Sequence, residues 1–191
     1  SEISMLNGLA LQRNGAKEKS WTRKVSPHYK DSDQHLKGLA GEYVVALALD
    51  SEIDQSITRH GDPGHDLLVD FRHRSNVPVG VKFTHRQYGH LYVAPNSRKD
   101  TEDSVYDFRC DLMVLVSGIC TINFDNTPPT GSCFCTPETM DQQEFTIRGW
   151  VTRDQFYERR ESRDWGYGEC WFVKQKDLNP FEELVGYLTY D

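Results

Sequence analysis

The chain has 191 residues, 37% of them hydrophobic and 12% aromatic, which suits a folded domain with a sizeable core and excludes a disordered chain. Its 22 basic and 29 acidic residues give a formal charge of −7, which argues against a generic nucleic-acid coat protein. No stretch reaches the roughly 20 apolar residues of a membrane span, and the N-terminal residues contain no apolar signal segment, so we expect no membrane partner.

The charge is uneven along the chain. Residues 1–37 hold seven basic and four acidic residues, a net +3, so the remainder carries −10. A basic arm on an acidic body can bind phosphate, and it is equally typical of a plain solvated tail. We therefore expect a basic N-terminal arm over residues 1–33 and a single domain over 34–191.

Five cysteines bear on compartment and metal binding. Their odd number, without a secretory signal, favours reduced thiols in the cytoplasm. Cys133 and Cys135 offer a zinc alternative, in which the chain would be a zinc-dependent interaction module. Structural zinc sites use C-x₂₋₄-C pairs, however, and this chain has only one short pair.

The first elements in chain order are helical. A helix is expected at 4–13. Residues 31–52 predict a stronger one, because Asp31, Ser32 and Asp33 offer N-caps before an apolar pattern at three- and four-residue steps. Its apolar stripe consists of Leu36, Leu39, Ala40, Tyr43, Val44, Leu47 and Ala48. Gly38 and Gly41 weaken this helix but allow close packing against a sheet, and Glu42 lies beside the stripe.

Strands follow the helix. Residues 66–71 predict a strand, 72–76 a hairpin loop, 77–85 the returning strand, and 90–95 a third strand. Residues 110–118 are an apolar run of strand length, typical of a central buried strand, and 120–125 are expected to form another strand.

In the C-terminal half we first expect a loop insertion at 126–143, because this segment is rich in proline, threonine and serine. Strands are expected at 145–152 and 169–174, a short charged helix at 153–163, and a turn with a helix at 178–188. This order of elements predicts an α/β or α+β domain with a central mixed sheet flanked by helices.

The hairpin is where chemistry is expected. If it is centred on residue 74, Asp66 faces Lys82 and Leu68 faces Gly80. Positions 80 and 82 also share a face, because side chains alternate along a strand. Glu42 joins this group if its helix packs on the same surface. A slip of one residue would separate Asp66 from Lys82.

Two carboxylates and a lysine at such a place can serve phosphodiester hydrolysis. A hard divalent cation activates water and neutralises phosphate charge, and a nearby lysine stabilises the transition state. The alternative is purely structural. An aspartate after a Gly-Pro turn is ordinary turn chemistry, and a lysine between Val81 and Phe83 can be an outward-facing strand residue.

The segments GLAGEYVVALAL, GHDLLVD and VGVKFTH, in this order, resemble the PD-(D/E)XK or restriction-endonuclease-like nuclease superfamily. The later segments GWVTRDQF, ECWFVK and DLNPFEEL look like the closing strands of phage and bacterial members. The resemblance covers roughly residues 36–188. It implies a restriction-endonuclease-like fold and a DNA endonuclease that depends on Mg²⁺ or Mn²⁺. It also makes a homodimer an expected state, because many such nucleases dimerise.

By this resemblance Glu42, Asp66 and Lys82 correspond to the helix acid, the metal aspartate and the catalytic lysine. The backbone carbonyl of Val81 would be a further metal ligand. DNA contacts are expected from Thr84, Arg86, Arg98 and Lys99, because contacts to the DNA backbone dominate affinity.

Gly80 departs from the family pattern, which has an acid at this position. Three explanations stay open. The acid has been substituted to trap an inactive enzyme, or the chain is a naturally inactivated homologue that only binds nucleic acid or a protein partner. In the third, another acid supplies the ligand, either Asp70, Asp62 or Glu42 itself, although Asp70 lies about 13 Å along the strand from Asp66.

Overall fold

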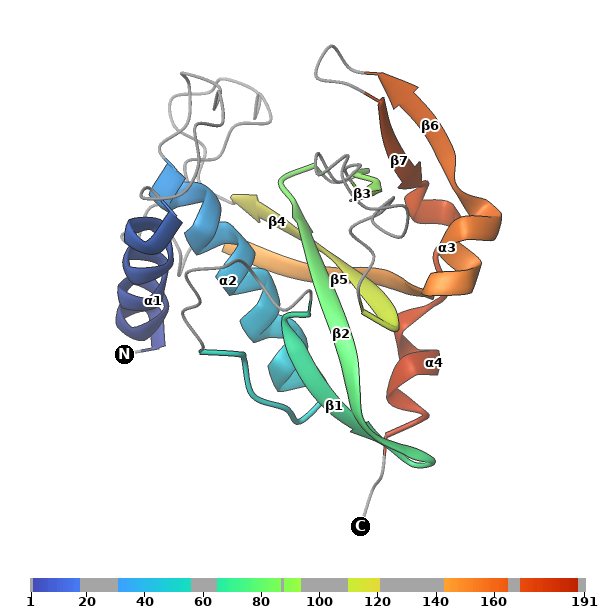
Figure 1. The fold of residues 1–191 in the computed structure, drawn as a ribbon, viewed down its shortest axis with the longest axis horizontal. Helices are drawn as coiled ribbons and strands as arrows, with labels where there is room; N and C mark the ends of the chain where they lie inside the picture. Colours follow the sequence, from blue (N-terminus) through green and yellow to red (C-terminus); the bar gives the residue numbers. More distant parts are fainter. Residues whose placement is uncertain are drawn as a thin grey trace.

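The computed structural model of the chain describes residues 2–17, 31–55, 65–86, 88–93, 110–120, 143–164 and 169–188. Within these residues a four-stranded mixed sheet in the order β1-β2-β4-β5 is flanked by helices (Figure 1). The predicted α/β class with a central mixed sheet is therefore confirmed.

The main sheet combines two antiparallel pairs with one parallel pair. β1 (Leu67–Phe71) pairs antiparallel with β2 (Arg74–Thr84), β2 pairs parallel with β4 (Leu112–Cys120), and β4 pairs antiparallel with β5 (Gln143–Thr152). The apolar run in β4 is buried from Leu112 to Val116, as expected for a central strand covered on both faces.

Two helices cover one face of this sheet. α2 (Asp31–Ala48) packs against β2, β4 and β5, and α1 (Glu2–Lys17) packs on α2 (Figure 1). Leu6, Leu9 and Ala10 of α1 belong to the main core cluster. Residues 2–17 of the expected basic arm are thus a helix with an apolar side held by the core, and residues 18–30 lie outside the described residues.

The buried face of α2 differs from the predicted stripe. Leu47 is 64% exposed, whereas Val45, Ala46 and Leu49 are buried. The reason is that α2 has neighbours on two sides, the sheet and α1, so its apolar surface is wider than a single stripe. A Cβ at Gly41 would lie 3.4 Å from the ring of Phe83, so this glycine does allow the close approach to β2.

A second sheet lies on the other face. Its order is β3-β7-β6, from β3 (Leu91–Val93), β7 (Glu169–Val173) and β6 (Glu161–Asp164). Together with α3 (Arg153–Arg159) it encloses a second core cluster, formed by Leu91, Val93, Cys110, Met113, Leu115, Val151, Phe156 and Val173. The main sheet is therefore covered on both faces.

The helix expected at 153–163 is shorter than predicted. α3 begins at a capping box, in which Thr152 and Gln155 bond each other's backbone, and it ends at Arg159. Residues 161–164 then form β6, and all four side chains are exposed. The first part of the charged segment 153–163 is therefore helical, and its last residues belong to β6, an edge strand of the second sheet.

The chain closes against the end of β5. The 3₁₀ turn η2 (Gln175–Asp177) leads to α4 (Phe181–Val185), and between them Asn179 exchanges two backbone hydrogen bonds with Trp150, of 2.8 and 3.0 Å. The strand expected at 120–125 and the insertion at 126–143 fall outside the described residues, apart from their ends at Cys120 and Gln143. None of the described helices is both long and apolar enough to cross a membrane.

Candidate functional site

The hairpin forms where it was expected, but in a different register. Leu67 pairs with Val79 and Leu68 with Pro78, so the expected pairs Asp66–Lys82 and Leu68–Gly80 are wrong by two residues. β2 begins at Arg74, which leaves only residues 72 and 73 in the turn. Gly80 and Lys82 share the face of β2 opposite Val79 and Val81 in any register, because side chains alternate along a strand.

Asp66 lies immediately before β1, beside β2. Its N–H donates to the carbonyl of Val79 at 2.9 Å, and its carboxylate Oδ2 accepts from the N–H of Val81 at 2.6 Å. The N–H and C=O of a strand residue point to the same side. The carbonyl of Val81 is therefore directed toward the edge of β2 on which the Asp66 carboxylate sits.

The space above Gly80 is filled by a cysteine. A Cβ added at Gly80 would lie 2.8 Å from the Sγ of Cys110 and 3.3 Å from Cγ of Met113. Met113 is the β4 partner of Gly80, and Cys110 is fully buried two residues before β4 begins. The space that a side chain at position 80 would enter is thus occupied by a thiol from the segment before β4.

The pKa of the Cys110 thiol is shifted by burial and by nearby charges. Burial raises the pKa of its thiol to about 11, while the charge of Lys82 acts to lower it and that of Asp66 to raise it. Both charged groups are therefore close enough to the thiol to interact with it electrostatically. Lys82 and Asp66 are both half-buried, whereas Cys110 belongs to the second core cluster.

Glu42 lies on α2, the helix that packs on β2. Its side chain is only 7% exposed, which is unusual for a glutamate. The adjacent Gly41 faces Val81 and Phe83, so α2 lies on the face of β2 opposite Lys82. Contrary to the expectation from sequence, Glu42 and Lys82 therefore do not share a face of β2, and any contact of Glu42 with Asp66 would pass around the edge of β2 near the start of β1.

The other two candidate acids, Asp70 and Asp62, are not placed at the site by the structure. The Oδ1 of Asp70 accepts from the N–H of Asn76 at 2.7 Å, which fixes the hairpin near its turn. Asn76 has a positive φ of 54°, and the β1–β2 register shifts between Val69 and Phe71, so Asp70 stabilises an irregular hairpin end. Asp62 lies outside the described residues.

The predicted DNA contacts are only partly described. Thr84 continues the Lys82 face, and its Oγ1 accepts from the N–H of Arg86 at 3.2 Å in the turn that follows β2. Arg86 is exposed, and its carbonyl accepts from Gly89 at 3.2 Å. Arg98 and Lys99 lie outside the described residues, as do Cys133 and Cys135 of the zinc alternative.

The donors assembled here fit a hard divalent cation in kind. Carboxylate and carbonyl oxygens are what Mg²⁺ takes from proteins, usually one or two carboxylates with water and phosphate completing the shell. In the part of the chain that the structure describes, however, no three or more His, Cys, Asp or Glu side chains gather as a metal-binding group. The carboxylates of Asp66 and Glu42, which lie on different elements, and the carbonyl of Val81 are few ligands for one metal ion. The absence of an acid at position 80 accounts for this small number.

Comparison of the chain with protein-family models, curated proteins and solved structures finds no match.

Proposed function

We propose that this chain belongs to the nuclease class that its sequence resembles, as a divalent-metal-dependent DNA endonuclease of restriction-endonuclease-like fold with a reduced metal site. The observation that carries the proposal is the position of Asp66. Its carboxylate lies at the edge of β2, bonded to the N–H of Val81, and Lys82 projects from the next position on the strand.

In this proposal Asp66, Glu42 and the carbonyl of Val81 hold Mg²⁺ or Mn²⁺. The bound ion would supply an activated water and neutralise charge on a phosphodiester. Lys82 would stabilise the negative charge that develops on the phosphate, since a fixed ammonium is most effective in a partly desolvated site. Arg86, with Thr84 beside it, would contact the backbone of a DNA strand running over this face.

The experiment must restore the missing acid without a collision. Gly80→Glu alone brings its Cβ within 2.8 Å of Cys110 Sγ, so the informative variant is Gly80→Glu with Cys110→Ala. Cys110→Ala alone is the matched control. We expect the double variant to bind Mn²⁺ more tightly than the parent chain in calorimetry and to nick supercoiled plasmid faster.

Two further variants locate the activity. Asp66→Asn should abolish Mn²⁺ binding, and Lys82→Ala should reduce nicking about a hundredfold with little change in Mn²⁺ binding. Lys176→Ala, an exposed lysine in η2, is the control for loss of a positive charge. Nicking that survives Asp66→Asn, or no nicking and no Mn²⁺ binding by any form on several DNA substrates, would refute the proposal.

A non-catalytic nucleic-acid binder on the same fold is the second candidate, favoured by the thiol of Cys110 in the place of the acid. This function predicts DNA retention that needs no metal and weakens steeply with salt, because it depends on phosphate contacts. Metal-dependent cleavage by the parent chain, abolished by Asp66→Asn, would exclude it.

A further inference from the structure

A surface pocket lies apart from the candidate nuclease site. Its volume is about 490 Å³, within the range of about 300–1,000 Å³ usual for small-molecule sites. It opens between the β1–β2 turn, the start of β4, the end of β5 and α4. Val77 and Leu112, which line it, belong to the main core cluster, whereas Gly80 and Cys110 face the second one.

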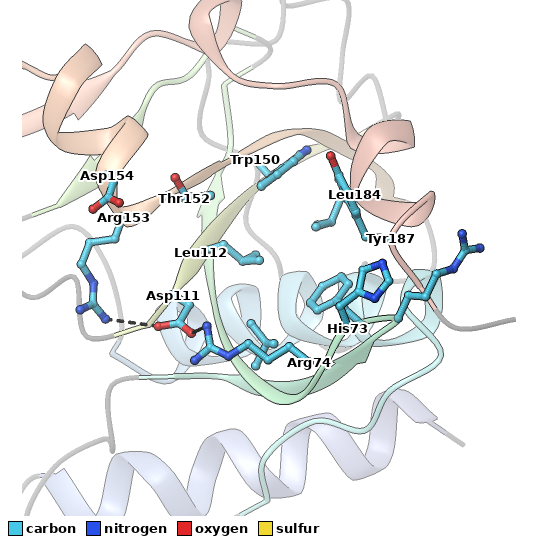
Figure 2. Close-up of a pocket in the computed structure, with 13 residues that line it drawn as sticks. His73, Arg74, Asp111, Leu112, Trp150, Thr152, Arg153, Asp154, Leu184 and Tyr187 are labelled. Carbon is cyan, nitrogen blue, oxygen red and sulfur yellow. Dashed lines mark ion pairs between the residues drawn. The ribbon is translucent and has the colours of Figure 1, made fainter.

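One side of the pocket is apolar and aromatic. Trp150 is held in place by a 3.0 Å hydrogen bond from its indole N–H to the carbonyl of Pro180, and Tyr187 packs edge-on to it with ring centroids 6.5 Å apart. Tyr187 is 55% exposed, so part of its ring surface is open to a ligand. Figure 2 shows these two rings together on one side of the hollow, with Leu112 at its floor.

The other side of the pocket is lined by charged side chains, and basic residues outnumber acidic ones there. Asp111 lies between two guanidinium groups, 2.5 Å from Arg74 and 3.6 Å from Arg153 (Figure 2). Arg153 is anchored because it also donates to the carbonyl of Cys110 at 2.8 Å. Arg74 has a side chain 65% exposed, and an ion pair this exposed is weak, so Arg74 can turn to an incoming anion.

The rim adds further positive charge. Arg72 and His73 from the turn also line the pocket, so three arginines stand against Asp111 and Asp154 in a chain whose overall charge is −7. A local excess of positive charge on an acidic protein selects for an anion. Aromatic walls facing that charge select for a flat ring attached to it.

We propose that this pocket binds a nucleotide, with the base against the exposed ring of Tyr187, which Trp150 supports, and the phosphate at Arg74. An arginine fork matches the phosphate oxygens, and base–aromatic stacking tolerates any base. The site does not depend on the proposed nuclease activity. The same chemistry is presented by a free nucleotide and by an unpaired nucleotide of a DNA strand.

Calorimetry with dAMP, deoxyadenosine, inorganic phosphate and a short single-stranded oligonucleotide tests the proposal. We expect dAMP to bind with a Kd of about 0.1–1 mM, more tightly than deoxyadenosine or phosphate, since neither half fills the site. Arg74→Gln and Tyr187→Leu should each weaken dAMP about fivefold or more. Arg163→Gln and Tyr92→Leu, matched changes in the second sheet, should leave the Kd within about twofold.

The oligonucleotide separates the two sources. Displacement of dAMP by the oligonucleotide, sensitive to Tyr187→Leu, identifies an unpaired strand as the ligand, and failure to displace it identifies the free nucleotide. Phosphate binding as tight as dAMP, or no dAMP binding at about 5 mM, overturns the nucleotide site. Loss of dAMP binding in Lys82→Ala but not in Arg74→Gln would place the nucleotide at the nuclease site, and would overturn this pocket while leaving the proposed function intact.

Discussion

At the scale of single residues, Cys110 is the one that sequence reasoning did not connect with the candidate site. It is fully buried, with its Sγ 2.8 Å from the position of a Cβ at Gly80. The glycine and the cysteine therefore form a complementary pair, one giving the volume that the other occupies. An acid at position 80 and a thiol at position 110 exclude each other in this backbone.

Because Cys110 is buried, we expect its thiol to react slowly with alkylating reagents. Because the pKa of Cys110 is raised to about 11, chiefly by burial, almost none of it is thiolate at pH 8. We expect iodoacetamide to leave Cys110 unmodified in the folded chain and to modify it fully in 6 M guanidinium, as measured by peptide mass mapping. Cys170, which is half-buried, serves as the internal comparison. Equal labelling of Cys110 in both conditions would contradict its burial.

The part of the candidate site that lies along β2 could be predicted from sequence, because side chains alternate along a strand. Gly80 and Lys82 share a face in any register, and the two-residue error in the hairpin left that face unchanged. Two things could not be predicted. The register depends on the irregular hairpin end at Asp70 and Asn76, and the neighbour of Gly80 is set by the parallel pairing of β2 with β4. Neither leaves a local pattern in the sequence.

At the scale of elements, the junction of β5 with the C-terminal segment depends on Gly149. Its φ is +139°, a conformation that side chains disfavour, and a Cβ there would lie 2.6 Å from the carbonyl oxygen of Asn179. This glycine is also where the β4–β5 register shifts, next to the pair formed by Trp150 and Asn179. The strand and the segment before α4 can approach each other only because position 149 has no side chain.

Gly149→Ala should therefore lower the free energy of unfolding by about 2–4 kcal/mol, from backbone strain and collision together. Gly8→Ala is the opposite control. Gly8 lies within α1 with nothing within 4 Å of an added Cβ, so alanine should raise the free energy of unfolding by about 0.5–1 kcal/mol. Urea denaturation measures both. A neutral Gly149→Ala would mean that β5 and Asn179 are not in the contact described.

The elements themselves were predicted best where one pattern extends over many residues. The apolar run of β4 and the periodic pattern of α2 each predict the element that is observed, whereas the charged pattern over 153–163 predicts helix where residues 161–164 form β6. The sequence of β6 contains no alternation of apolar and polar residues. Its residues are Glu161, Ser162, Arg163 and Asp164. They are extended because β7 pairs with them, which is a tertiary effect that local propensity does not contain.

At the scale of the whole molecule, α2 links the stability of the fold to pH. His85, at the end of β2, has a lowered pKa because it is partly buried and lies near the positive charges of Lys37 and Arg86. The unfolded chain therefore binds a proton more readily than the folded one. The resulting stability is fully present above the ordinary pKa of 6.5 and is lost as the pH falls through the lowered value.

We accordingly expect the free energy of unfolding to decrease as the pH falls below about 6.5, and His85→Gln to make that decrease shallower. Urea titrations of both forms between pH 8 and pH 5 measure the difference in slope. A slope unchanged by His85→Gln would show that protonation of this imidazole does not oppose folding.

The parallel pairing of β2 with β4 has a consequence for how the chain assembles. Asp66 and Val81 are joined through a short hairpin, which closes early because its two strands are neighbours in the sequence. Val79 and Leu112, by contrast, meet only after a connection of some thirty residues has been drawn into place. We therefore expect the carboxylate of Asp66 to reach its strand edge before the thiol of Cys110 packs on Gly80.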